Sequence, residues 1–339
     1  MRKILFFAHD PGGANAIKPL ILPLMAKGFE CFIYGKGPAL FILPNVAEYA
    51  GNTDELIKNV KPNFIITGTS AKDMTEKELR KSAHKHGILC LAILDFWVNY
   101  NRFTKYSTKE LAKNKRYNEL DYLPDFLIVM DTYAKDEASK QGVPKELMYP
   151  LGNPHFRYIK DCFDALDVSG LRTSLLKGKQ KLILWASEPH TNNYGLECLK
   201  DLIEHIPDNA RLLIKPHPRE KLDKFEKIAR GGGGTIIKNI SSLQAIKISD
   251  LIVSITSMVL LESIIVNKSA LSYQKYETNP NKFILTKRKI LPFINDEITL
   301  KNELQRALKF NSCVYKNVDL NFNATENIIK FIEDRLCQN

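Results

Sequence analysis

The chain alternates short apolar runs with helix-like stretches, and this alternation most constrains what it can fold into. The runs consist almost wholly of Val, Ile, Leu and Phe, which is typical of strands buried on both faces of a parallel sheet. In the first half, strands are expected at residues 4–8, 30–34, 64–67, 88–94 and 126–130. The alternation then restarts, with strands expected at residues 182–186, 211–214, 235–237, 251–254 and 270–273. Two such series predict an α/β protein with two Rossmann-like lobes, whose parallel sheets face a central cleft.

These series divide the chain into four expected parts. A first lobe is expected at residues 1–155 and a second lobe at residues 181–315. Residues 156–180 are more polar and irregular, so we interpret them as a connector. Residues 316–339 contain a last expected helix. The length of 339 residues suits two domains of ordinary size.

Composition and charge exclude several classes of protein. The chain is 44% hydrophobic and 26% charged, which is typical of a soluble globular protein, and no apolar run approaches the roughly 18 residues of a membrane span. The six cysteines are scattered without a CxxC pair, which favours free thiols in a reducing cytoplasm. The net charge of +11 favours a polyanionic substrate or an acidic membrane surface. Dispersed lysines and the lack of an RRM, KH or zinc pattern argue against nucleic acid.

A histidine is held between two prolines in the second lobe. Lys215-Pro216-His217-Pro218 follows the apolar run at residues 211–214. Each proline fixes its own φ and pushes the preceding residue out of helical space, so His217 lies on a rigid turn. Open α/β sheets bind ligands at the carboxyl ends of their strands. Lys215 and His217 are therefore candidate phosphate contacts.

Two further turns of the second lobe are expected at the same sheet edge. Ser187-Glu188-Pro189-His190 ends one strand, and Ser254-Ile255-Thr256-Ser257 ends another and opens an apolar helix. Hydroxyls beside the free N–H groups of a helix N-terminus can hold phosphates. The candidate contacts from these turns are Ser187, His190, Ser254, Thr256 and Ser257.

Glu262 is a carboxylate in that apolar helix. A carboxylate in such surroundings is costly unless it has a partner. A pair of ribose hydroxyls would be one such partner, and a contact within the protein is the alternative.

The first strand ends in a glycine-containing turn, His9-Asp10-Pro11-Gly12-Gly13-Ala14-Asn15, which opens a helix. Gly12 and Gly13 let a ligand approach the backbone, and the helix N-terminus favours an anion or a hydroxyl. Asp10 is the first candidate for a general base and His9 the second. A tight turn in which Asp10 caps the helix is the alternative.

Other turns of the first lobe are expected at the same edge as Asp10, because parallel strands end at one rim. Thr67-Gly68-Thr69-Ser70 and Asp95-Phe96-Trp97-Val98-Asn99 each follow a strand. The stretch from Phe96 to Tyr117 mixes aromatic residues with basic ones such as Arg102. Ordinary turns and a solvated surface are the alternatives. The candidates for the acceptor side of a site are Gly12, Gly13, Asn15, Thr69, Asp95, Asn99 and Arg102.

Two conspicuous patterns do not predict a site. Gly231–Gly234 precedes a strand instead of joining a strand to a helix as a P-loop does, so we interpret it as a flexible helix cap and loop. His84 and His86 lie at a lysine-rich helix end, and no DxD cluster occurs. We interpret the two histidines as a surface pair and predict no metal site.

Lys215–Pro218 and Ser254–Ser257 together resemble the "HP" and serine/threonine motifs of nucleotide-sugar glycosyltransferases with the GT-B fold. They are similar to those of bacterial sialyl- and polysialyltransferases, capsule-type transferases and CDP-glycerol glycerophosphotransferases. The segments Tyr133–Pro144 and Gly152–Pro154 resemble the end of the first lobe of this fold and also resemble the non-hydrolysing UDP-N-acetylglucosamine 2-epimerases. The architecture resembles a GT-B-like fold along essentially the whole chain, whereas the motifs cover a small part of it.

The resemblance implies roles for the lobes and for several residues. The second lobe would bind a nucleotide-activated donor, the first lobe the acceptor, and the last helix would return to the first lobe. His217 would contact the donor phosphate, Glu262 the ribose, and Asp10 would stand at the place of the catalytic base. Basic residues and helix dipoles would stabilise the leaving nucleotide, so no metal or other cofactor is implied.

We therefore predict a cytoplasmic, metal-independent glycosyltransferase, whose net charge allows peripheral contact with the acidic inner face of the membrane. It would move a sugar or polyol phosphate from a nucleotide donor, with CMP or CDP favoured over UDP, to a surface-glycan or lipid-linked acceptor. One alternative is a sugar-nucleotide 2-epimerase of the same fold, which needs acid and base carboxylates such as Asp10 and Asp95. Another is a non-catalytic subunit that binds nucleotide sugars.

Overall fold

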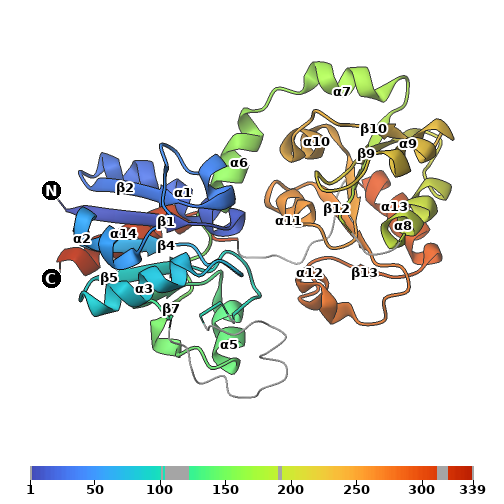
Figure 1. Ribbon diagram of the computed structural model, residues 1–339. Coiled ribbons are helices and arrows are strands. Elements are labelled where there is room, and N and C mark those ends of the chain that lie inside the picture. Colours follow the sequence, from blue (N-terminus) through green and yellow to red (C-terminus); the bar gives the residue numbers. More distant parts are fainter. Residues whose placement is uncertain (1, 101, 104–121, 190–192, 311–319, 338–339) are drawn as a thin grey trace. The chain divides into compact units, whose positions relative to one another are not determined.

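The computed structural model describes residues 2–100, 102–103, 122–189, 193–310 and 320–337 (Figure 1). The chain forms two compact units. Unit 1 comprises Met1–Tyr158 and Asp319–Asn339, and unit 2 comprises Ile159–Val318. Each unit contains a parallel sheet with helices on both faces, so the predicted α/β class and its two parallel sheets are confirmed. The four-part division expected from the sequence stays a prediction.

In the described residues, unit 1 holds a seven-stranded parallel sheet of order β3-β2-β1-β4-β5-β6-β7. Its strands are β1 (Lys3–Ala8), β2 (Glu30–Gly35), β3 (Ala47–Glu48), β4 (Phe64–Thr67), β5 (Leu89–Ile93), β6 (Phe126–Ile128) and β7 (Met148–Tyr149). The chain builds outward from β1 to β3, then returns to β4 on the other side of β1. The strand order therefore reverses between β1 and β4, where open sheets of this kind bind ligands.

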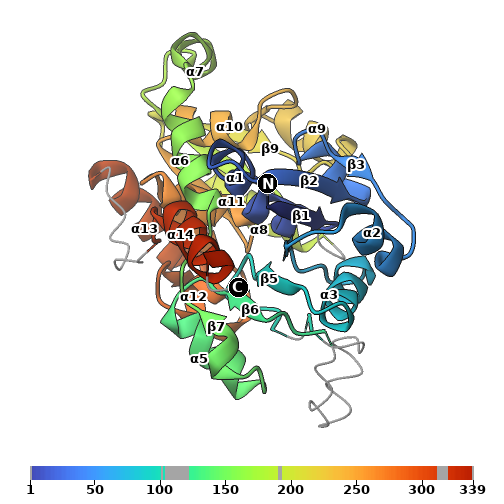
Figure 2. The same cartoon turned by 90° about the vertical axis from the view of Figure 1, so that its left-hand side faces the viewer.

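Helices cover both faces of the unit 1 sheet because its central strands are apolar on both sides. The helices are α1 (Pro11–Ala26), α2 (Thr53–Val60), α3 (Thr75–Lys85), α5 (Thr132–Lys140) and α14 (Ala324–Cys337). Ile4 and Phe6 of β1 pack in one core with α1 and α14, which lie beside each other (Figure 2). Leu5 and Phe7 pack in a second core with α2 and α3. The last helix thus completes the fold of unit 1.

In its described part, unit 2 holds a six-stranded parallel sheet of order β10-β9-β8-β11-β12-β13. Its strands are β8 (Lys181–Ala186), β9 (Ala210–Lys215), β10 (Thr235–Ile236), β11 (Leu251–Ser254), β12 (Ser269–Tyr273) and β13 (Phe293–Ile294). The order reverses between β8 and β11, at the position equivalent to the β1–β4 reversal of unit 1.

Unit 2 repeats the layered arrangement of unit 1. Its helices include α8 (Tyr194–Glu204), α9 (Asp223–Arg230), α10 (Ser242–Ile248), α11 (Met258–Ile265), α12 (Ile284–Lys287) and α13 (Glu297–Phe310). Trp185 of β8 and Leu271 of β12 share a core with α8, α9 and α13. Helices α10 and α11 contact the sheet strands from outside this core. No helix in the described ranges is both long and apolar enough to cross a membrane.

The stretch expected to be an irregular connector forms two helices, α6 (His155–Ala165) and α7 (Ser169–Leu176). Its polar composition hid a helical spacing of apolar residues in α6, where Phe156 and Ile159 are buried. By contrast, Gly231 caps the end of α9 as expected, with its N–H donating to the carbonyl of Lys227.

Candidate functional site

Two loops meet at the strand reversal of unit 1, one after β1 and one after β4. Gly13 of the first loop lies against Gly68 of the second. A Cβ added to Gly13 would be 2.9 Å from the Gly68 Cα, and a Cβ added to Gly68 would be 2.7 Å from the Gly13 Cα. Real Cβ atoms essentially never approach this closely, so both positions require glycine for the loops to touch.

A buried carboxylate ties these two loops together. Glu76, in the first turn of α3, is fully buried and accepts the backbone N–H of His9 at 2.9 Å and of Ser70 at 2.5 Å. Arg80, one turn further along α3, is also fully buried and donates to the Gly68 carbonyl at 3.2 Å. Sequence reasoning missed both residues because α3 is rich in charged residues and reads as a solvated helix. Their spacing of four residues on one helix face was the available signal.

Asp10 reaches across to the β4 loop instead of capping α1. It occupies the N-cap position of α1, but its side chain makes no capping hydrogen bond. Its Oδ2 accepts the Ala71 N–H at 2.8 Å, and its Oδ1 lies 2.7 Å from His9 Nδ1. His9 Nε2 lies 3.9 Å from Asp73 Oδ2. Burial acts to raise the Asp73 pKa, but hydrogen bonds from Thr75 outweigh it and lower that pKa. The His9–Asp10 pair is therefore held in place from both sides.

Asp95, in the loop after β5, lies against Gly12 of the β1 loop. Its carboxylate lies so close to Gly12 that a Cβ there would be 1.8 Å from Asp95 Oδ2. Burial raises the Asp95 pKa, and the nearby carboxylate of Asp10 raises it further, whereas Arg102 opposes the shift. Arg102 lies 3.7 Å from Asp95 Oδ1 and also donates to the Thr69 carbonyl. The carboxylates of Asp10 and Asp95 are thus close enough to interact electrostatically.

The remaining acceptor-side candidates differ in their exposure to solvent. Asn15 is half-buried in the first turns of α1, and Asn99 is exposed in the loop after β5 with a φ of 67°. Thr69 is fully buried and donates to the Ile93 carbonyl at 3.4 Å. Asn153 was not a candidate, yet its side-chain amide donates to the Asp95 carbonyl at 3.0 Å. It holds the backbone from which the Asp95 side chain projects.

At the strand reversal of unit 2, the loops after β8 and β11 are joined by Glu188. Its carboxylate accepts the backbone N–H of Thr256 and, at 2.8 Å, the Thr256 hydroxyl. Ser257 caps α11 by accepting the Val259 N–H at 3.3 Å. Ser254 is fully buried and donates to the Ala186 carbonyl at 2.5 Å.

The hydroxyl candidates of unit 2 therefore differ in what they can offer a ligand. Those of Ser254 and Thr256 are engaged within the protein, and Ser187 is buried. His190 lies outside the described residues.

Among the described residues, only one ring nitrogen of His217 makes a hydrogen bond. His217 Nδ1 accepts the backbone N–H of Arg219 at 3.1 Å, and the His217 N–H donates to Glu220 Oε2 at 3.1 Å. Burial lowers the His217 pKa, with Arg219 adding to the shift. In the neutral ring, an accepting Nδ1 leaves the proton on Nε2. His217 can therefore present an N–H donor, which suits a phosphate oxygen.

Glu262 carries an oxygen without a partner. Burial raises its pKa to about 7, and the opposing effect comes from Lys215. Among the described residues, Glu262 Oε2 has no hydrogen-bond partner although it is buried. Lys215 Nζ donates to the Ile240 carbonyl at 2.5 Å, and burial lowers its pKa. A buried, unpartnered carboxylate oxygen suits a hydroxyl donor from a ligand.

A cavity of about 500 Å³ adjoins this edge of the unit 2 sheet. Thr256 and Ile255 line it from the β11 loop, while Gln274 and Tyr276 line it from the loop after β12. Sequence reasoning missed the β12 loop, whose Tyr276 is 71% exposed and adopts a φ of 62°. A cavity of about 510 Å³ lined by Gly232–Gly234 lies around the start of β10, away from the His217 turn.

No protein-family model matches the sequence, and no curated protein matches it. Solved structures are similar along nearly the whole chain. A candidate UDP-N-acetylglucosamine 2-epimerase from Listeria monocytogenes has 14% identity and a TM-score of 0.76, with 99% of this chain and 97% of that one covered. UDP-GlcNAc 2-epimerase from Methanocaldococcus jannaschii has 15% identity and a TM-score of 0.74, with 98% and 99% covered. The enzyme from Neisseria meningitidis, bound to UDP-GlcNAc, has 13% identity and a TM-score of 0.68, with 98% and 100% covered.

These similarities confirm the GT-B-like fold of two Rossmann-like domains, which is what identities this low establish. The prediction of a glycosyltransferase is contradicted, because many of the similar structures are 2-epimerases and favour the alternative function. The resemblance to glycosyltransferases rested on two short turns of unit 2, which cover a small part of the chain.

Proposed function

We propose that the protein is a sugar-nucleotide 2-epimerase that acts on a uridine diphosphate sugar. The proposal is supported by the similarity to 2-epimerases, including the Neisseria meningitidis enzyme bound to UDP-GlcNAc and a Staphylococcus aureus protein, MnaA, bound to UDP. Uridine thereby replaces cytidine as the base to test first. No metal or other cofactor enters the proposal.

The pair of carboxylates in unit 1 carries the proposal. Inverting a C–H centre requires removal of a proton from one face of the carbon and return of a proton to the other. Two acid/base groups in different environments suit this task. The raised pKa of Asp95 favours its protonated form, which suits a proton donor. Asp10, fixed by Ala71 and His9, suits the proton acceptor.

Groups of unit 2 are suited to stabilise the leaving nucleotide, whose departure allows this proton to be removed. The C2 proton of a sugar is not acidic, so its loss must be coupled to departure of the nucleoside diphosphate from C1. The Nε2–H of His217, the ammonium of Lys215 and the N-terminus of α11 are suited to the charge that develops on that phosphate. Re-addition of the same nucleotide then restores the C1 bond, and protonation of the opposite face of C2 gives the epimer. Atoms and charge balance without an outside reagent.

Incubation of the full chain with UDP-GlcNAc and no acceptor tests the proposal. We expect a second UDP-sugar, the C2 epimer, to be separated by anion-exchange chromatography and identified by NMR. Asp95→Asn and Asp10→Asn should each lower the rate about 10²–10⁴-fold, because an amide can neither donate nor accept the proton. Asp136→Asn is the matched control, since that carboxylate is exposed on α5.

Two outcomes would overturn the proposal. If UDP binds but the UDP-sugar is recovered unchanged, the protein is a non-catalytic binding subunit. If Asp10→Asn and Asp95→Asn turn over at the rate of Asp136→Asn, the two carboxylates do not perform the proton transfer.

A further inference from the structure

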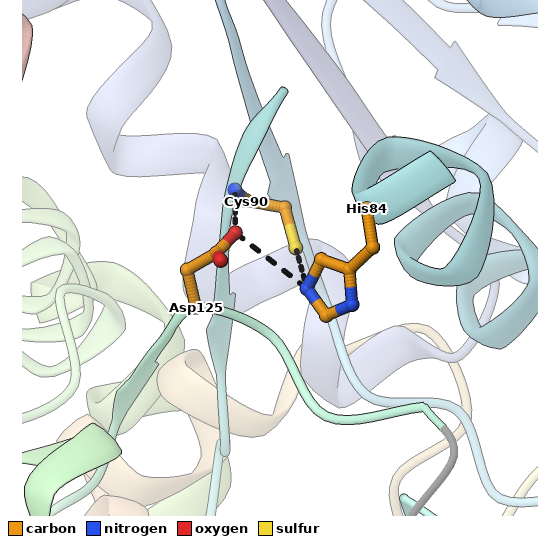
Figure 3. Close-up of side chains that lie close together, drawn as sticks. All are labelled: His84, Cys90 and Asp125. Carbon is orange, nitrogen blue, oxygen red and sulfur yellow. Dashed lines mark hydrogen bonds and ion pairs between the residues drawn. The ribbon is translucent and has the colours of Figure 1, made fainter. Parts of the chain in front are cut away.

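Three potential metal ligands converge in unit 1 at the end of the sheet opposite to Asp10 and Asp95 (Figure 3). His84 lies in the last turn of α3, Cys90 is the second residue of β5, and Asp125 directly precedes β6. The parallel register pairs Leu91 with Phe126, so Asp125 stands beside Cys90. Helix α3 ends near the same strand ends, which places His84 next to Cys90. We propose that His84, Cys90 and Asp125 bind a zinc ion.

The distances fit a tetrahedral ion. His84 Nε2 lies 3.9 Å from Cys90 Sγ and 3.6 Å from Asp125 Oδ2. One ligand atom from each of the three residues lies within 4.8 Å of the others. With Zn–S near 2.3 Å and Zn–N and Zn–O near 2.0 Å, tetrahedral ligand atoms lie about 3.3–3.6 Å apart. The two distances from His84 Nε2 exceed these values by a few tenths of an ångström, and the distance between Cys90 and Asp125 ligand atoms lies within 4.8 Å.

The ligand types fit zinc better than a hard cation. A thiolate, an imidazole and a carboxylate form the mixed sulfur, nitrogen and oxygen set that Zn²⁺ takes, whereas Mg²⁺ and Ca²⁺ prefer oxygen alone. The Cys90 backbone N–H donates to Asp125 Oδ2 at 2.7 Å and orients this carboxylate. Such outer hydrogen bonds are typical of metal ligands. As the Zn–S bond forms, the thiol proton leaves to solvent.

The exposure of the cluster provides a way in for the ion. The side chains of His84 and Asp125 are 43% and 30% exposed, whereas Cys90 is fully buried. An ion would thus enter from the His84 side and complete its coordination with water. His86 Nε2 lies 3.4 Å from Asp54 Oδ1, outside this cluster. The sequence paired His84 with His86, whereas in the structure His84 lies beside Cys90 and Asp125.

The site is independent of the proposed epimerisation. It lies at the amino ends of β5 and β6, whereas Asp95 follows the carboxyl end of β5. A bound ion would join the end of α3 to two strands and would stabilise that part of unit 1. The same helix carries Glu76 near its other end, so the ion would help to hold the helix that joins the β1 and β4 loops.

Cobalt(II) titration of the full chain, after removal of metal by a chelator, tests the site. We expect one equivalent to bind with a thiolate-to-cobalt charge-transfer band in the near ultraviolet and the strong visible absorption of tetrahedral cobalt. Zn²⁺ should displace it and raise the unfolding temperature of the metal-free protein. His84→Ala and Asp125→Asn should each weaken cobalt binding at least about 10-fold. Loss of a residue that only hydrogen-bonds to a metal ligand already costs about 10- to 100-fold.

Two control variants separate this site from other thiols and histidines. Cys31→Ser removes a half-buried thiol on β2, and His86→Ala removes the neighbouring histidine. Both should bind cobalt as the unchanged protein does, whereas Cys90→Ser should lose the charge-transfer band. His84→Ala provides the same comparison on the exposed side of the site if Cys90→Ser does not fold. Absence of the band in the unchanged protein, or a cobalt affinity of His84→Ala equal to that of the unchanged protein, would overturn the proposal.

Discussion

The two units share one topology but place different chemistry at the strand reversal. In unit 1 this edge holds several carboxylates, and those of Asp10 and Glu76 accept hydrogen bonds from backbone N–H groups. In unit 2 the equivalent edge carries Lys215, His217 and the N-terminus of α11, with a single unpartnered oxygen on Glu262 among its described residues. The fold fixes the position of a site, whereas the loops decide whether it suits protons or phosphates.

Removal of Glu76 should have the largest effect on unit 1. Glu76→Ala leaves two buried N–H groups and the buried guanidinium of Arg80 without this carboxylate, which should lower the free energy of unfolding by about 3–5 kcal/mol. Denaturant unfolding of the full chain measures the change. Glu78→Ala, on the same helix and partly exposed, should change stability by less than about 0.5 kcal/mol. Equal effects would show that Glu76 does not hold the loops.

The pH dependence of stability should report the burial of Glu262 in unit 2. The pKa of Glu262 is raised to about 7, so the folded protein keeps a proton that the unfolded chain releases above its ordinary pKa of about 4.3. The unfolded state therefore binds fewer protons between these values, and stability falls as pH rises through that window. At about 1.4 kcal/mol per pKa unit, the loss over the whole window is about 3.5 kcal/mol.

Glu262→Gln should remove this fall in stability. The difference in the free energy of unfolding between the unchanged protein and Glu262→Gln, measured at pH 5 and pH 7.5, isolates the contribution of this residue from other titrating groups. The same difference at both pH values would contradict burial of a protonated Glu262.

Gly13→Ala tests the close approach of the β1 and β4 loops. The new Cβ would meet backbone atoms of Gly68 and Thr69, which cannot move without displacing β4, so a loss of about 1–3 kcal/mol is expected. Gly170→Ala is the matched control, since a Cβ there meets nothing within 4 Å in helix α7. It should stabilise the protein by about 0.5–1 kcal/mol. Calorimetry measures the unfolding temperature of both variants. Equal shifts in unfolding temperature would contradict the close contact between the β1 and β4 loops.

His217→Ala should have the smallest effect, on binding instead of folding. Loss of one N–H donor to phosphate should weaken UDP binding about tenfold, which corresponds to about 1.4 kcal/mol. Isothermal titration calorimetry measures it. His205→Ala, at the end of α8 and away from the His217 turn, serves as control. Unchanged affinity in His217→Ala would remove the phosphate role from unit 2.

Much of the fold could be predicted because buried parallel strands read as continuous apolar runs. The strands that escaped prediction, β3 and β13, have two residues each and carry no such signal. Helices α6 and α7 were taken for a connector because a polar composition masked the spacing of their few apolar residues. Pairing with neighbours, which a local pattern does not contain, determines these elements.

The candidate sites were predictable in position but not in their interactions. Asp10, Asp95 and His217 all follow strands, so their sheet edge could be read from the sequence. The burial of Glu76 and Arg80 could not, since each looks like a surface charge on α3. Likewise, His84, Cys90 and Asp125 are brought together by the register of β5 and β6, which only the folded sheet defines.

Incorporation of solvent deuterium tests the central claim most directly. UDP-GlcNAc incubated with the full chain in D₂O should gain deuterium at C2 of the sugar in both epimers, observed as loss of the C2 proton signal by NMR. Asp95→Asn should suppress this exchange, while Asp136→Asn should not. Conversion or binding of the UDP-sugar with the C2 proton fully retained would contradict proton transfer by the unit 1 carboxylates.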